Sequence, residues 1–313
     1  MTNEMRMVTT KINPRILVIR GGALGDFVLT LPVFRALREK WPEAWIECLS
    51  SNDYWTLAKA SRWVDGGRSL NGRCWAEFFV SNGELSVMEK SWLGQFDYVI
   101  SYLHDPKEVW RANVESCFRG EYISGHSRPN DEVGLPASQV LLEALTALGI
   151  GDHPDLAPSL RIGNADHGKW AFHPGSGSTS KNWPEDDWIA WARAWLENNP
   201  APLVMVTGEV EEGRKESMVR AIDRGRLEVW DNLPVLELAR RLEGCVGFVG
   251  HDSGVTHLAA ALRVPCLVLW GPTCDRVWRP LNSNVTILKH PEGLPALQVE
   301  DVQAAVDKLG GPH

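Results

Sequence analysis

The sequence has little of what marks a metalloprotein, a membrane protein or a nucleic-acid-binding protein. Its 313 residues include six cysteines, but no C-x-x-C pair and no zinc-like spacing. No apolar stretch approaches the about 20 residues that cross a bilayer, and the polar N-terminus lacks a signal peptide's apolar core. With 32 Lys and Arg against 40 Asp and Glu, the net charge is −8, which offers no basic face to a phosphate backbone. These absences predict a reduced, cytoplasmic protein that binds no nucleic acid.

Several catalytic motifs are also missing. The chain has no G-x-G-x-x-G turn, which argues against a nicotinamide oxidoreductase. It has no H-E-x-x-H, no G-x-S-x-G and no EF-hand loop, so nothing in it marks a metal centre or a serine hydrolase. We therefore expect neither a metal nor a cofactor.

What the chain does contain is an alternation of short apolar runs with helical patterns, which is typical of an α/β fold with parallel sheets. The length suits two domains. Gly and Pro gather at 149–158, so we expect Rossmann-like domains over 1–160 and 161–313, with an active site in the cleft between them. Residues 60–95 give no clear pattern. Strands are predicted at 16–19, 45–49, 98–101, 122–124, 170–173, 203–207, 246–249 and 266–270, and helices at 27–40, 107–118, 138–148, 184–195, 211–224, 235–242, 255–262 and 298–309.

The first stretch with chemical character is RGGALGD at 20–26. Glycines 21, 22 and 25 permit positive φ and close backbone approach where a strand turns into a helix. Asp26 falls in the first helical turn, where the helix dipole stabilises a carboxylate. Two interpretations stay open at this point: Asp26 caps the helix, or it acts in chemistry.

The second stretch, HPGSGSTSKNWPEDDW at 173–188, follows a predicted strand directly. Its Gly, Ser and Thr residues expose N–H and hydroxyl groups that suit phosphate oxygens, and Lys181 adds a positive charge. The residues around Lys181 differ from a P-loop, which argues against phosphoryl transfer. Acidic residues 185–187 are expected to begin a helix rather than bind metal. Trp188, Trp191 and Trp195 are expected to pack in the core.

The third stretch is GHDSGVTHLAAAL at 250–262. A small turn before an apolar helix provides free N–H groups and a helix dipole for an anion. Asp252 or Ser253 is the expected N-cap, and capping is compatible with binding. His257 is either a structural histidine or part of the same site.

Together these stretches resemble glycosyltransferase family 9, the ADP-heptose:lipopolysaccharide heptosyltransferases, through GDFVLTLP (25–32), SKNWPEDDW (180–188) and HDSGVTHLAAAL (251–262). The resemblance extends from residue 16 to about residue 273. It implies a GT-B fold with the acceptor on the N-terminal side and the nucleotide sugar on the C-terminal side. It also implies that helix 298–309 crosses back to the N-terminal domain.

The resemblance assigns roles to individual residues. Asp26 would be the base that deprotonates the acceptor hydroxyl, supported by the turn at Gly22 and Gly25. The implied reaction is an inverting, metal-independent transfer from an ADP-sugar, such as ADP-heptose, to a lipopolysaccharide-core or related glycan. The donor would be held by Ser176, Ser178, Lys181, Glu209, Asp252, Ser253, Gly254 and His257.

Other functions stay open on the sequence alone. A sugar-nucleotide epimerase or hydrolase of the same fold would share the donor site, and a non-catalytic nucleotide-sugar-binding protein would keep the same motifs. The seven-residue turn at 20–26 departs from that of heptosyltransferases I and II, which is usually shorter and contains serine. This departure leaves the acceptor and the sugar open. Arg62, Arg68 and Arg73 are candidates to bind an acidic acceptor, and peripheral contact with the inner membrane is also open.

Overall fold

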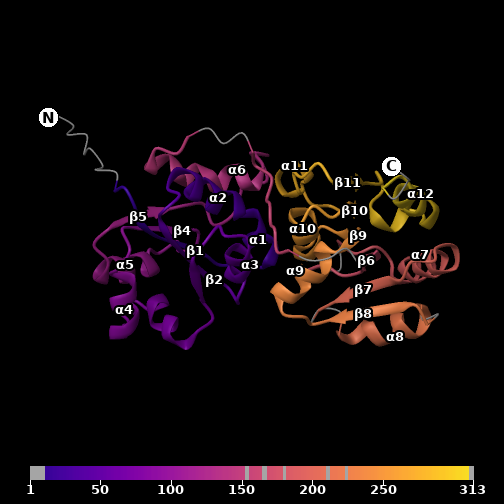
Figure 1. The fold of residues 1–313 in the computed structure, drawn as a ribbon, viewed down its shortest axis with the longest axis horizontal. Coiled ribbons are helices and arrows are strands. Elements are labelled where there is room, and N and C mark those ends of the chain that lie inside the picture. Colours follow the sequence, from indigo (N-terminus) through magenta and orange to yellow (C-terminus); the bar gives the residue numbers. More distant parts are fainter. Residues whose placement is uncertain are drawn as a thin grey trace.

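The structure is a computed structural model that describes residues 11–151, 155–163, 168–178, 181–208, 212–222 and 225–309. Two α/β domains lie side by side, each with a parallel sheet at its centre (Figure 1). This architecture confirms the predicted α/β class. Among the described residues, no helix is both long and apolar enough to span a membrane.

The N-terminal sheet has the strand order β3-β2-β1-β4-β5, and all its pairs are parallel. Its central strand β1 contains Ile16–Ile19, none of whose side chains is exposed, because helices cover both faces of the sheet. Val18 of β1 lies in register with Cys48 of β2 and Ile100 of β4. The strands are β1 (Arg15–Arg20), β2 (Trp45–Ser50), β3 (Gly66–Ser69), β4 (Tyr98–Ser101) and β5 (Glu121–Ser124).

The helices of this domain follow the strands in turn. They are α1 (Leu24–Leu29), α2 (Leu31–Lys40), α3 (Trp55–Ala60), α4 (Val87–Leu93), α5 (Val109–Cys117) and α6 (Ala137–Leu142), with 3₁₀ turns at Arg73–Phe79 and Glu143–Leu148. The single helix expected at 27–40 is interrupted at Thr30 because Pro32 has no N–H to continue the helical bonding, and the Thr30 hydroxyl donates to the Asp26 carbonyl at 2.8 Å.

The C-terminal sheet has the order β11-β10-β9-β6-β7-β8, again with all pairs parallel. If β6 to β11 are numbered 1 to 6 along the chain, the order read from the β8 edge is 3-2-1-4-5-6, the doubly wound order of a Rossmann fold. Sequence reasoning missed β8 and β11, whose side chains are mostly half-buried, so their apolar runs are short. The strands are β6 (Lys169–His173), β7 (Leu203–Thr207), β8 (Leu227–Asp231), β9 (Cys245–His251), β10 (Cys266–Leu269) and β11 (Val285–Leu288).

The helices of the C-terminal domain cover both faces of its sheet. Trp188, Trp191 and Trp195 are buried on α7, which confirms their predicted place in the core. Acidic residues 185–187 form the first turn of the same helix, as predicted. The helices are α7 (Glu185–Asn198), α8 (Glu212–Ile222), α9 (Val235–Glu243), α10 (Gly254–Ala261), α11 (Asp275–Trp278) and α12 (Val299–Leu309), with a 3₁₀ turn at Leu294–Ala296.

The last helix does not return to the N-terminal domain, so that prediction is wrong. Helix α12 lies at the far side of the C-terminal domain and packs on α7 and β10 (Figure 1). Its Val302 and Val306 are buried in the same cluster as the α7 tryptophans. This apolar stripe finds its partner within its own domain, which removes the driving force for crossing back.

Candidate functional site

The two sheets place their switch points opposite each other. Strand order reverses between β1 and β4 in the first sheet and between β6 and β9 in the second. Ligands of open α/β sheets bind beyond the carboxyl ends of such strands. A cavity of about 640 Å³ lies between the domains there, within the usual size range of ligand sites. Its walls include residues that follow all four strands, among them Gly21, Asp26, Tyr102, Leu103, His104, Gly177, Lys181, Asp252, Ser253 and Gly254.

The Asp26 carboxylate lies on the N-terminal wall of this cavity. One of its oxygens accepts a hydrogen bond from the Ala23 N–H at 2.9 Å, so Asp26 does cap helix α1. The side chain is still 34% exposed. A methyl group added at Gly22 would lie 2.5 Å from the carboxylate, and Gly22 has φ +96. The cap and the cavity-facing carboxylate therefore coexist, and Gly22 provides the space for both.

Arg20, which sequence reasoning did not single out, holds this carboxylate in position. Its Nη2 lies 3.3 Å from Asp26 Oδ1, and its Nε donates to the Asp26 carbonyl at 3.2 Å. The same guanidinium donates to the Ser127 carbonyl at 2.8 Å, and only 3% of the side chain is exposed. Burial lowers the pKa of Arg20, while the charge of Asp26 opposes that shift. The sequence did hold a signal for Arg20, which is a charged residue at the end of the apolar run ILVI and directly before a glycine turn.

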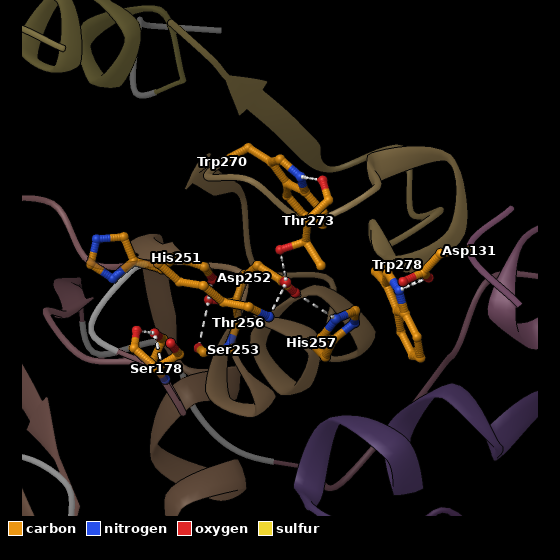
Figure 2. A network of polar contacts seen from close by, with 12 residues as sticks. Asp131, Ser178, His251, Asp252, Ser253, Thr256, His257, Trp270, Thr273 and Trp278 are labelled. Atoms are coloured by element: carbon orange, nitrogen blue, oxygen red, sulfur yellow. Dashed lines mark hydrogen bonds and ion pairs between the residues drawn. The ribbon is translucent and has the colours of Figure 1, made fainter. Parts of the chain in front are cut away.

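On the opposite wall three side chains surround the Asp252 carboxylate. Lys181 Nζ donates to its Oδ2 at 2.8 Å. The Thr273 hydroxyl also donates to Oδ2 at 2.8 Å, and His257 Nε2 lies 3.7 Å from Oδ1 (Figure 2). Burial by itself would raise the pKa of Asp252, but the hydrogen bonds and charges of His257 and Lys181 outweigh it and hold that pKa well below its usual range. Asp252 is therefore an ionised anchor that orients Lys181 and His257 toward the cavity.

Helix α10 points its N-terminus into the same space. Ser253 is its N-cap, and the Ser253 hydroxyl accepts from the Thr256 N–H at 3.3 Å. The N–H groups of Gly254 and Val255 have no carbonyl partner inside the helix, as in any first turn. His257, which is 4% exposed, has an Nδ1 atom without a hydrogen-bond partner among the described residues.

The segment that leads from Lys181 into α7 is held in place by the buried side chain of His251. His251 Nε2 accepts from the Trp183 N–H at 2.8 Å, and its ring packs edge-on against Trp188. Burial lowers the pKa of His251 to about 3, so the ring is neutral and structural. His251 holds the chain beyond Lys181 against β9 and thereby places the Lys181 ammonium.

The two halves meet at a pair of glycines, Gly25 of α1 and Gly254 of α10. A methyl group added at Gly254 would lie 2.9 Å from both the Gly25 nitrogen and the Leu24 Cβ. Gly22 has a positive φ, but Gly21 and Gly25 do not, so the expectation of positive φ holds only for Gly22. The close approach constrains Gly254, because a methyl group added at Gly25 would meet Gly254 Cα only at 3.5 Å, an ordinary contact.

A second cavity of about 850 Å³ adjoins the first and shares Ala23, Gly177, Ser253 and Gly254 with it. Its C-terminal walls include His173, Thr207, Gly208, Trp230 and Asn232. Its apolar walls include Val206, Leu233, Leu238 and Val255. This cavity lies beyond the ends of β6, β7 and β8, where a Rossmann-like domain holds a nucleoside.

The other predicted donor residues have different positions. Ser176 lines the second cavity, but its side chain is buried, and its hydroxyl oxygen lies 2.7 Å from both the Ser178 carbonyl and Asn182 Oδ1. Ser176 thus shapes the loop. Ser178 is exposed and is not among the residues lining either cavity. Glu209 lies outside the described residues.

At the rim of the first cavity, a loop of the N-terminal domain reaches α11. Trp278 Nε1 donates to Asp131 at 2.6 Å, and the Arg128 guanidinium lies 5.5 Å from the centre of the Trp278 ring (Figure 2 shows the Trp278–Asp131 contact). Arg128 lines the cavity, whereas Arg62, Arg68 and Arg73 do not. Arg68 instead stacks over Trp92 at 4.2 Å.

Comparisons with known proteins agree with this arrangement. A family model described as glycosyltransferase family 9 (heptosyltransferase) matches residues 144–306, more than half of the chain. The chain is 22% identical over 346 aligned positions to lipopolysaccharide heptosyltransferase 3 of Escherichia coli K12, covering 91% of this chain and 95% of that protein.

Two solved structures share the fold. ADP-heptose LPS heptosyltransferase II of E. coli superposes with a TM-score of 0.76 at 16% identity, covering 94% of this chain and 98% of that chain. E. coli heptosyltransferase WaaC, solved with ADP, gives 0.74 at 18% identity, covering 95% of this chain and all of that one. These matches confirm the predicted GT-B fold.

Proposed function

The chain belongs to glycosyltransferase family 9, and we propose that it transfers a sugar, heptose in the first instance, from an ADP-sugar to a hydroxyl of a lipopolysaccharide core or related glycan. One observation carries this proposal. The Asp26 carboxylate of one domain and the Lys181–Asp252–His257 cluster of the other face a common cavity. A base and an anion site on opposite walls are the groups that a single displacement requires.

Asp26 is the proposed base. Its carboxylate removes the proton of the acceptor hydroxyl while that oxygen bonds to the anomeric carbon of the donor. The bond between the anomeric carbon and the diphosphate oxygen breaks in the same step, so the configuration at that carbon inverts. A positioned base of this kind contributes about 10²–10⁴-fold to the rate. Arg20 and the Ala23 N–H keep the carboxylate in place for the transfer.

The leaving nucleoside diphosphate gains negative charge as the bond breaks. Lys181 lies beside the first-turn N–H groups of α10, and both stabilise that charge without rearrangement. Asp252 serves this site indirectly, because its carboxylate pairs with Lys181, accepts from Thr273 and lies beside His257. We propose that these fixed donors replace a divalent metal. The described residues contain no cluster of His, Cys, Asp and Glu able to hold one.

The second cavity is the proposed site of the donor nucleoside. Its apolar walls suit a flat base, and Thr207 and Asn232 offer polar contacts. ADP as the nucleotide is supported by the solved WaaC complex with ADP, a protein of the same fold. The glycan acceptor then enters the first cavity from the N-terminal side, past Arg128 and His104.

A donor screen tests this function. Purified protein is incubated with ADP-heptose and with other ADP-, UDP- and GDP-sugars, with and without a lipopolysaccharide-core acceptor, and nucleoside diphosphate release is measured. We expect acceptor-dependent release from ADP-heptose that excess EDTA does not reduce. Calorimetry with ADP, UDP, GDP and NAD runs alongside. Binding of NAD but of none of the diphosphates would overturn the transferase proposal.

A further inference from the structure

The second cavity has walls from both domains. The residues discussed so far explain its C-terminal side, but Leu24, Asn52 and Tyr54 of the N-terminal domain also line it. Asn52 and Tyr54 belong to the loop that follows β2, and α3, which begins after Tyr54, contacts α9 of the C-terminal domain. The loop therefore lies where the domains meet, beside the proposed nucleoside site.

Three side chains hold this loop in a defined geometry. Asn71 Nδ2 donates to Asn52 Oδ1 at 2.7 Å, and Asn52 Nδ2 donates to the Tyr54 hydroxyl at 3.1 Å. The Tyr54 ring packs on Phe27, with centroids 5.9 Å apart. Asn52 has φ 49, a left-handed conformation that asparagine tolerates better than most residues.

In this chain of hydrogen bonds from Asn71 to Asn52 to Tyr54, the hydrogen of the Tyr54 hydroxyl stays available for a further bond. The oxygen accepts from Asn52, so its O–H can donate to a group inside the cavity. Tyr54 lines this cavity together with the apolar side chains Val206, Leu233, Leu238 and Val255. A nucleoside combines a flat base, which suits apolar walls, with ring nitrogens and hydroxyls that can accept a hydrogen bond from the Tyr54 hydroxyl.

We propose that Tyr54, oriented by Asn52, binds the nucleoside of the donor from the N-terminal domain, so that both domains complete the donor site. This inference rests on the proposed function, because it assigns the second cavity to the donor. It makes Tyr54 a determinant of donor affinity that lies outside the three motif stretches.

Tyr54→Phe tests it, because the substitution removes the hydroxyl and keeps the ring on Phe27. Asn52→Gly is the second variant, since glycine tolerates the positive φ. Tyr122→Phe, on strand β5 and away from both cavities, is the matched control. Calorimetry with ADP and initial rates with separately varied donor and acceptor are measured for each protein.

We expect Tyr54→Phe to weaken ADP binding and raise the donor KM by about two- to tenfold, the range of one neutral hydrogen bond. Its kcat, acceptor KM and melting temperature should stay at the wild-type values, and Tyr122→Phe should match wild type in ADP affinity and donor KM. Asn52→Gly should move donor KM in the same direction.

Two results overturn the inference alone. One is a Tyr54→Phe protein with unchanged ADP affinity, beside a wild type that binds ADP and transfers sugar. The other is a rise in acceptor KM in place of donor KM. A wild-type protein that binds no nucleoside diphosphate overturns the proposed function itself, and the inference with it.

Discussion

Replacing Gly254 by alanine should separate the two catalytic walls. The new methyl would lie 2.9 Å from the Gly25 nitrogen and 2.9 Å from the Leu24 Cβ, whereas carbon contacts relax only at about 3.5–4.0 Å. Both neighbours belong to the backbone or to the root of a side chain, so neither can rotate away. The domains must therefore move apart by roughly 0.5–1 Å at this point.

The cost of this movement can be estimated in two ways. Overpacking of a tight contact typically destabilises by about 1–3 kcal/mol. Misplacing reacting groups by about 1 Å can cost on the order of 10²-fold in rate. Because α10 holds the anion site and α1 holds Asp26, the same shift alters both the leaving-group contacts and the position of the base.

The assay compares Gly254→Ala with Gly25→Ala in melting temperature, ADP affinity and kcat/KM for transfer. An alanine methyl at Gly25 would meet Gly254 Cα at 3.5 Å and His257 at 3.6 Å, which are ordinary contacts. Gly25→Ala should therefore retain the wild-type melting temperature and ADP affinity. Gly254→Ala should lose stability and most of kcat/KM. Wild-type stability and activity in Gly254→Ala would refute the reasoning.

Two further predictions concern buried charge. Arg20→Lys keeps a positive charge but loses the guanidinium group that reaches both Asp26 and the Ser127 carbonyl. The free energy of unfolding, measured in urea, should therefore fall by about 1–3 kcal/mol. A variant as stable as wild type would contradict the role given to Arg20. His251 has a pKa lowered to about 3 in the folded protein, so the unfolded chain binds the extra proton below its ordinary value near 6.5. The free energy of unfolding should then fall as the pH drops from 6.5 toward 3, by about 1.4 kcal/mol per unit from this residue. In urea titrations at pH 7, 6 and 5, His251→Gln should show a smaller pH dependence than wild type, and an equal slope would count against a neutral buried His251.

Much of the fold follows from local sequence. ILVI at 16–19 and LVMVT at 203–207 are continuous apolar runs, because strands covered on both faces need no polar alternation. Residues 60–95 gave no clear pattern because the region consists of a short edge strand, a 3₁₀ turn and a short helix around Trp75 and Trp92. These elements are too short to show a period.

The sequence predicted those site residues that follow the carboxyl end of a strand. Asp26, Lys181 and Asp252 each follow a strand end, and the topology brings all three to one cavity. Arg20 was missed because an arginine at the end of a strand looks like its solvent-facing residue. Tyr54 was missed because its place on the cavity wall depends on contact between α3 and α9, which no local pattern records.

The most direct measurement of the central claim is sugar transfer by Asp26→Asn. Asparagine keeps the shape of the side chain, and its one oxygen can accept either from Arg20 or from the Ala23 N–H, so the protein should still fold and bind ADP. Asp301→Asn on α12 is a control away from the cavities. We predict that kcat/KM for transfer falls by about 10²–10⁴-fold while ADP affinity is retained. Transfer near the wild-type rate would show that Asp26 is not the base.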